Sequence, residues 1–85
     1  MKKLCLESNE NGSSLIITGD IEFIFSNRRA ARYLKDTVKF AKNDNYIVIE
    51  TDDGINKNID RIKKLCEYID AELVYSDRVS EAVTN

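Results

Sequence analysis

Basic residues recur along one stretch of the chain at the spacing of a single helix face. When each residue advances a helix by about 100°, five of them fall within a sector of roughly 80°. These five are Arg28, Arg32, Lys35, Lys39 and Lys42, and Arg29 lies beside them. Guanidinium and ammonium groups in such a row can contact phosphate oxygens or the carboxylates of an acidic protein. The six residues are therefore our candidate binding site, for nucleic acid without sequence specificity or for an acidic partner.

The charge of the chain is segregated, although its total of −2 is unremarkable in size. Residues 26–42 contain six basic residues and one acid, a net charge of +5, whereas the rest contains seven basic and fourteen acidic residues, a net −7. Like charges four residues apart on a helix cost a few tenths of a kcal/mol each. The alternative interpretation is an ordinary solvated helix face, which includes the case that its cations pair with acids elsewhere on the fold.

Catalytic chemistry has little support in the residue types. The chain has no histidine, which excludes histidine-activated serine or cysteine nucleophiles and histidine-based metal sites. Cys5 and Cys66 lie far apart in sequence, and we expect both to be reduced core residues. No glycine-rich phosphate-binding loop occurs. We therefore expect a chain that is not an enzyme and needs no cofactor.

An acidic cluster, Glu50, Asp52 and Asp53, follows the apolar run that ends near residue 51. Carboxylates at the end of a central strand could hold magnesium and support phosphoryl transfer. Thr51, Asp52 and Asp53 are also ordinary helix-capping residues, which explains the cluster more simply. We therefore expect no metal site there.

Five aromatic residues occupy apolar-stripe or strand positions, which favours core or rim packing over stacking on nucleic-acid bases. They are Tyr33, Phe40, Tyr46, Tyr68 and Tyr75.

The N-terminal third is expected to form an antiparallel meander. Residues 2–7 and 15–18 are strand-like, and Asn11-Gly12 between them is typical of a hairpin. A turn at Gly19-Asp20 leads to residues 21–25, read as a third strand or an extended approach to a helix. Ser26 can cap a helix that we expect from about 26 to 42.

The remaining elements alternate between strand and helix. Residues 46–51 are apolar and β-branched, as in an interior strand. Apolar residues then recur at steps of four and three from Ile55 to Ile69, which predicts a second amphipathic helix to about Asp70. Residues 72–76 form a last short strand.

These elements predict one α/β domain, of the mixed α+β kind, over residues 1–76. A β-meander followed by β-α-β-α-β gives one mixed sheet of four or five strands, with parallel neighbours and two main helices on one face. Residues 77–85 carry the start of a third helix or a truncated linker, and we favour interruption of a longer chain. No apolar run is long enough to span a membrane, and we expect a cytoplasmic protein.

The stretch GDIEFIFSNRRAARYLKDTVKFAKNDNYIVIETDDGINKNIDRIKKLCEYIDAELVYSDRVSEAV resembles the N-terminal accessory region of some bacterial DEAD/DEAH-type helicases over residues 19 to 83. The resemblance implies a regulatory or substrate-contacting module, with the ATPase motor beyond Asn85. No Walker motif is present, so no catalytic residue is carried over.

Two hypotheses about function follow from the sequence. The first is a noncatalytic accessory domain, of a nucleic-acid-processing protein, that contacts phosphates or an acidic partner through the basic helix face. The second is a small stand-alone interaction protein, such as a phage-type inhibitor, that docks through its acidic surface or a sheet edge.

Overall fold

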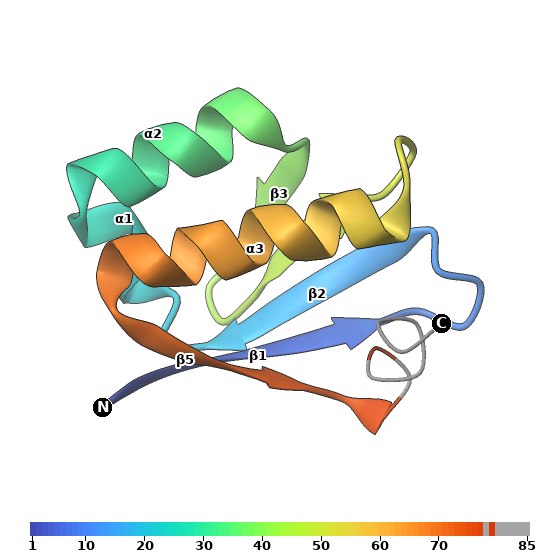
Figure 1. The fold of residues 1–85 in the computed structure, drawn as a ribbon, viewed down its shortest axis with the longest axis horizontal. Coiled ribbons are helices and arrows are strands. Elements are labelled where there is room, and N and C mark those ends of the chain that lie inside the picture. The colour runs from blue at the N-terminus through green and yellow to red at the C-terminus, as the bar shows by residue number, and fades with distance from the viewer. Residues whose placement is uncertain (78, 80–85) are drawn as a thin grey trace.

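A computed structural model describes residues 1–77 and 79 of the chain (Figure 1). Its elements in order are β1 (Lys2–Ser8), β2 (Ser14–Gly19), α1 (Glu22–Ser26), α2 (Arg28–Thr37), β3 (Phe40–Lys42), β4 (Ile47–Glu50), α3 (Ile55–Ile69) and β5 (Ala71–Tyr75). The five strands form one sheet in the order β3-β4-β2-β1-β5. β1 and β5 pair in parallel and the other neighbours are antiparallel. The predicted mixed sheet in a small α+β domain is confirmed.

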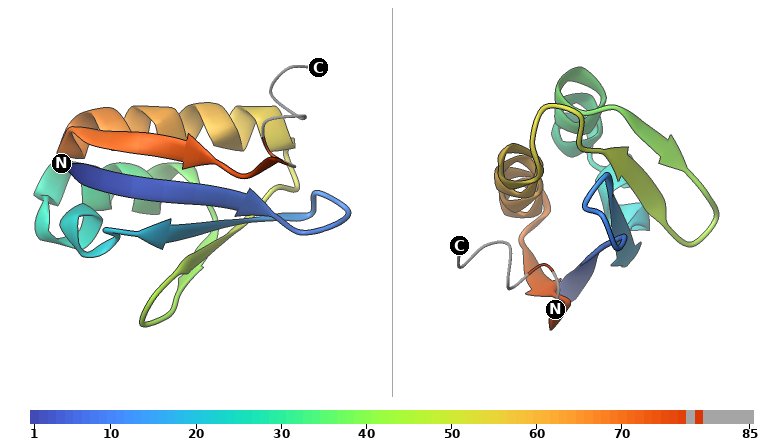
Figure 2. Two further views of the ribbon diagram at one scale, coloured as in Figure 1. Left: turned by 90° about the horizontal axis from the view of Figure 1, so that it is seen from below. Right: turned by 90° about the vertical axis from the view of Figure 1, so that its right-hand side faces the viewer.

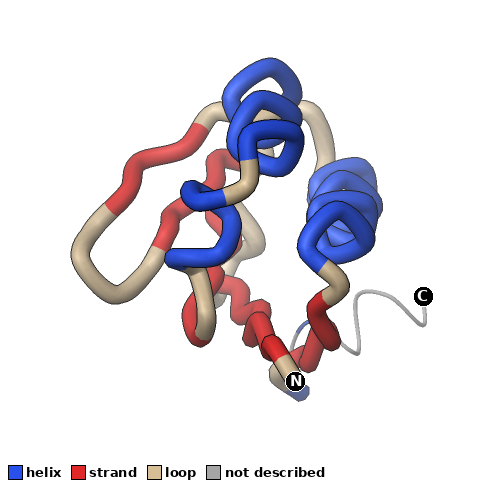
Figure 3. Tube along the Cα trace, turned by 90° about the vertical axis from the view of Figure 1, so that its left-hand side faces the viewer, coloured by secondary structure: helices blue, strands red, loops and turns tan. Residues whose placement is uncertain are grey.

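α2 and α3 lie side by side over one face of this sheet (Figures 2 and 3). The strands turn alternate side chains toward the helices, as a pleated strand requires. Leu6 of β1, Ile17 of β2 and Ile47 of β4 are aligned across the sheet and have no exposed surface. The opposite face carries Cys5 and Ile16, which are only partly buried. The core therefore lies between the sheet and the helices.

α3 matches the predicted second helix closely. Its apolar residues at steps of four and three, including Ile59, Ile62 and Ile69, are buried against the sheet. The helix ends at Asp70, which adopts the left-handed conformation at φ 54° and donates its N–H to the carbonyls of Cys66 and Glu67. A left-handed residue at this position is a common way to end a helix.

The third strand expected at residues 21–25 is wrong, because this segment forms the short helix α1. Ile21 and Ile24 are both buried, and Phe25 packs against the core beside them. Residues three and four apart share one side of a helix, so this spacing serves a helical turn as well as an alternating strand. The predicted β-meander accordingly contains only the β1–β2 hairpin.

The first long helix is shorter than expected, because α2 ends at Thr37 and not near residue 42. Val38 is fully extended at φ −131° and ψ 153°, and Phe40 to Lys42 form strand β3 on the edge of the sheet. Val38 and Phe40 both pack against the core from alternate positions. This period-two pattern, which begins after the β-branched Thr37, favours a strand.

Two predicted caps are also corrected. Asn27, and not Ser26, caps α2, since its side-chain oxygen accepts a hydrogen bond from the N–H of Ala30 at 3.0 Å. α3 begins after Gly54 without a side-chain cap. The hydroxyl of Thr51 instead donates to the carbonyl of Gly12, across the end of the β1–β2 hairpin.

The expected parallel neighbours between residues 21 and 76 do not form. β4 and β5 flank α3 in the chain, but β2 and β1 lie between them in the sheet. Of the expected third helix, residues 78 and 80–85 lie outside the described part, while Val79 is described and its side chain is fully buried. Within the described residues, no helix is both long and apolar enough to cross a membrane.

Candidate functional site

The basic residues singled out in the sequence divide between two elements. Four of them are exposed on α2, namely Arg28, Arg29, Arg32 and Lys35. Lys39 is exposed just beyond the end of the helix, and Lys42 lies on β3. The five residues expected within one sector of a single helix were Arg28, Arg32, Lys35, Lys39 and Lys42. Because α2 ends at Thr37, only Arg28, Arg32 and Lys35 share a helix face.

Lys42 is the member that the fold separates from the rest. Its ammonium group lies 5.2 Å from the centroid of the Phe25 ring of α1. A cation over an aromatic face contributes about 0.5–1 kcal/mol at an exposed position. Lys42 lies on the edge strand β3 and beside α1, so it does not share a surface with the basic residues of α2.

Ion pairs do not neutralise the other five cations within residues 1–77 and 79. The salt bridge present there joins Arg61 and Asp53 at 2.7 Å and involves none of the five. Pairing of the basic helix face with acids elsewhere on the fold, one case of the alternative interpretation, therefore finds no support in this part of the chain. The positive charge of α2 is thus directed to the solvent.

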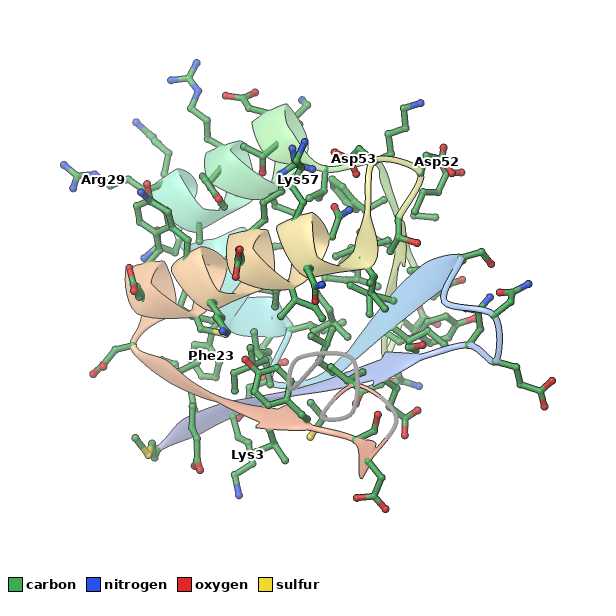
Figure 4. All side chains as sticks on the ribbon, turned by 45° about the vertical axis from the view of Figure 1, so that its right-hand side comes forward. Lys3, Phe23, Arg29, Asp52, Asp53 and Lys57 are labelled. Carbon is green, nitrogen blue, oxygen red and sulfur yellow. The ribbon has the colours of Figure 1, made fainter. Side chains whose placement is uncertain are left out.

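A second row of cations, which the sequence reading missed, runs along α3. Lys57, Arg61 and Lys64 recur at steps of four and three, and Tyr68 continues the row four residues later. This spacing places them on one side of the helix. Tyr68 contacts Tyr33 of α2, so the row borders the groove between the two helices. Figure 4 shows Lys57 on α3 and Arg29 at the N-terminal end of α2.

The exposed flank of α3 next to this row has a different character. Asp60, Lys63 and Glu67 are exposed there and mix the two signs of charge, and Asp60 is within one helical turn of Lys57 and Lys64. The cations of α3 therefore gather toward the side that borders α2, with acids on the adjoining flank. We name this surface the two-helix face, consisting of Arg28, Arg29, Arg32, Lys35, Lys39, Lys57, Arg61, Lys64 and Tyr68.

One hollow of the two-helix face combines cations with aromatic rings. It has a volume of about 420 Å³ and is lined by Arg29, Arg32, Tyr33, Asp36 and Tyr68. The Tyr33 and Tyr68 rings lie 5.4 Å apart between centroids, at 47°. This tilted contact is a favourable aromatic geometry, which holds the two helices together at this point.

A second hollow, of about 370 Å³, lies at the other end of the groove, where α2 ends and α3 begins. Lys35, Lys39 and Arg61 line it together with the predicted acidic cluster, Glu50, Asp52 and Asp53. Figure 4 shows Asp52 and Asp53 in the loop that leads into α3. The charges in this hollow largely balance, so it does not favour anions as the α2 side does.

Asp53 has a structural role in that loop. Its carboxylate accepts hydrogen bonds from Asn58 and from Arg61, both at 2.7 Å, and Asn58 also donates to the carbonyl of Gly54 at 2.7 Å. The Asn58 hydrogen bond, followed by that of Arg61, holds the pKa of Asp53 below its ordinary value of 3.8. Asn58 itself is buried with all its polar atoms bonded, so it fixes the loop to the first turn of α3.

The acidic cluster does not assemble into a metal site in the described residues. There, no three histidine, cysteine, aspartate or glutamate side chains approach closely enough to hold an ion. Both cysteines are free thiols. Burial raises the pKa of the Cys66 thiol to about 11, as expected of a core residue, whereas Cys5 is only partly buried.

Comparison of the chain with protein-family models, with curated proteins and with solved structures gives no match.

Proposed function

We propose that this chain is a noncatalytic domain that binds nucleic acid, with the two-helix face against the phosphate backbone. The observation that carries the proposal is the presence of cations on both helices that border one groove. On the α2 side they have no carboxylate partner within the described residues. Unpaired arginines and lysines displace the cations condensed on a nucleic acid when they contact its phosphates, and the release of those counterions is the main driving force for nonspecific binding.

The geometry suits phosphate contacts better than base recognition in a duplex groove. The basic side chains of α2 are spread along its ten residues, and α3, which lies beside it, carries a second row of cations. Contacts to phosphates position a protein on nucleic acid without specifying a sequence. We expect binding that depends steeply on salt and hardly on sequence.

The resemblance to helicase accessory regions supports the same assignment. In such a setting the domain holds nucleic acid for a motor that lies elsewhere, and its own lack of catalytic motifs is in keeping with that role. We further propose that the protein acts in the cytoplasm.

The test is fluorescence anisotropy with labelled mixed-sequence DNA and RNA at low salt. The variant Arg32→Glu/Lys39→Glu reverses two charges of the two-helix face and should abolish most of the binding. The matched control is Lys3→Glu/Lys63→Glu, which changes the net charge equally. Lys3 is exposed on the sheet face opposite the helices (Figure 4), and Lys63 is exposed on α3 about 100° around the helix from Lys64.

The control should retain most of the wild-type affinity, because its charges lie away from the groove. Absence of binding by the wild-type domain at low salt would overturn the proposal. So would an equal loss in the two double variants, since that would reflect net charge and not a defined surface.

The second candidate function, docking on a protein, has one observation in its favour. Val74 of β5 is 36% exposed and shares the face opposite the helices with Cys5 and Ile16. β5 also ends the order of the described strands, and a partner strand can add to a terminal strand. A Val74→Glu substitution should abolish capture of such a partner from the source cell and leave nucleic-acid binding unchanged.

A further inference from the structure

Tyr68 stands out among the aromatic residues because it is exposed beside cations. Its side chain is on the α3 row, and the residue is 38% exposed although it contacts Tyr33. Arg29 and Arg32 line the same hollow. A tyrosine kept at the surface by a ring contact on one side can present the rest of its ring to a ligand.

Tyr68 also lines a neighbouring hollow of about 390 Å³, which reaches α1. Phe23 lies there with 37% of its surface exposed, and the ammonium group of Lys2 is 5.1 Å from the centroid of its ring. Figure 4 shows Phe23 beyond α3 on the side of α1. Two exposed rings, each with cations close by, thus line adjoining hollows at one end of the molecule.

We infer that the nucleic acid bound by the two-helix face is single-stranded, with unpaired bases stacked on Tyr68 and then on Phe23. The inference rests on the proposed function and names its ligand class. Arg29 and Arg32 would contact the phosphates that flank the base on Tyr68, and Lys2 those near Phe23. Bases in a duplex are stacked on one another, so only an unpaired strand offers their flat faces to a protein ring.

The acidic residues of these hollows fit bases better than phosphates. Asp36 lines the first hollow and Asp70 the second. A carboxylate repels a phosphate, but it accepts hydrogen bonds from the amino groups of bases. In these hollows cations alternate with aromatic rings, and a carboxylate lies beside each ring. This order matches an unpaired strand, in which phosphates alternate with bases.

The experiment measures affinity for three probes of equal length by fluorescence anisotropy at low salt. The probes are oligothymidylate, an abasic strand that keeps the phosphates but lacks bases, and a duplex. Tyr68→Ala should weaken oligothymidylate binding roughly five- to 150-fold, the range expected for the loss of one base–aromatic stack. Its affinity for the abasic strand and for the duplex should fall much less, because the cations that contact phosphates remain.

Three further variants control for packing. Tyr68→Phe keeps the ring and should retain wild-type affinity for all probes. Phe23→Ala tests the second ring without disturbing the Tyr33–Tyr68 contact and should also weaken oligothymidylate selectively. Tyr46→Ala removes a tyrosine of similar exposure, 39%, that lines neither of the two hollows, and should have no effect.

The outcomes separate this inference from the proposed function. If all probes bind and depend on Arg32, but Tyr68→Ala and Phe23→Ala weaken every probe equally or not at all, base stacking is refuted and phosphate binding stands. If no probe binds the wild-type protein at low salt, both proposals fail.

Discussion

Replacing Lys64 with glutamine should weaken the binding of single-stranded nucleic acid, whereas replacing its neighbour Lys63 should not. Both side chains are exposed on α3, and each substitution removes one positive charge. They differ in direction, because residues one apart on a helix point about 100° away from each other. Lys64 lies on the row with Arg61 and Tyr68 that borders α2, and Lys63 lies on the mixed-charge side.

The size of the effect follows from the number of available cations. Seven cations of the two-helix face lack a carboxylate partner in residues 1–77 and 79, namely Arg28, Arg29, Arg32, Lys35, Lys39, Lys57 and Lys64. Each phosphate contact with a single strand contributes about −0.7 to the slope of log K against log salt. If all seven engage, the slope is about −5, and loss of Lys64 makes it about 0.7 less steep. At a salt concentration of about 0.15 M this corresponds to roughly a fourfold weaker affinity.

The assay is a titration of a labelled oligonucleotide by anisotropy at several salt concentrations. The two variants should unfold thermally like the wild type, because neither side chain is buried. A fourfold loss for Lys64→Gln with wild-type behaviour of Lys63→Gln supports a directed face. Equal effects of the two substitutions on the slope would refute the reasoning, since net charge alone would then account for binding.

Three further predictions concern the framework of the site. Asn58→Ala should lower the free energy of unfolding in urea by about 1–3 kcal/mol, because it removes the buried side-chain amide that donates to the Asp53 carboxylate and to the Gly54 carbonyl. The folded protein has a lowered pKa at Asp53, so the stability that this carboxylate contributes is present above its unfolded pKa and is lost as pH falls through its folded pKa. The difference in free energy of unfolding between Asn58→Ala and the wild type should therefore become smaller in acid. Gly19→Ala should cost more than about 1 kcal/mol in the same assay, since φ is +98° and a Cβ would lie 2.5 Å from the carbonyl oxygen of Lys3. At a pH of about 8, thiol reagents should modify Cys5 in the native protein and Cys66 only after unfolding, as mass spectrometry can show; modification of both at one rate would contradict the burial of Cys66.

The sequence predicts best those elements whose pattern is long or whose composition is one-sided. α3 has apolar residues over four turns, from Ile55 to Ile69, and was placed nearly to the residue. β4 was recognised because Ile47, Val48 and Ile49 are β-branched without interruption. In such segments local preference and burial in the fold favour the same structure.

Two short segments were misread because both periods fit them. The five residues from Ile21 to Phe25 satisfy a strand and one helical turn alike, and burial of Ile21 and Ile24 beneath α2 and α3 decides for the helix. Leu34, Val38 and Ala41, at steps of four and three, also fit a continued helix. There the hairpin with β4, in which Phe40 is aligned with Ile49, decides for the strand. In both segments the secondary structure is decided by contacts with residues distant in the sequence, which a local pattern cannot reveal.

The sequence predicted the α2 part of the candidate site but not the α3 part, for a related reason. The row on α2 is visible in the sequence because its helix has a single acid, whereas α3 contains Asp60 and Glu67 among its lysines and looks evenly charged. Which flank of α3 borders α2 depends on how the two helices pack, and the Tyr33–Tyr68 contact fixes that packing. The same contact therefore both supports the core and aligns the cations of α3 with those of α2. If Tyr68 also stacks on a base, the same ring contributes to helix packing and to ligand binding. Tyr68→Phe keeps the ring, so it should preserve both the contact with Tyr33 and the affinity for a single strand.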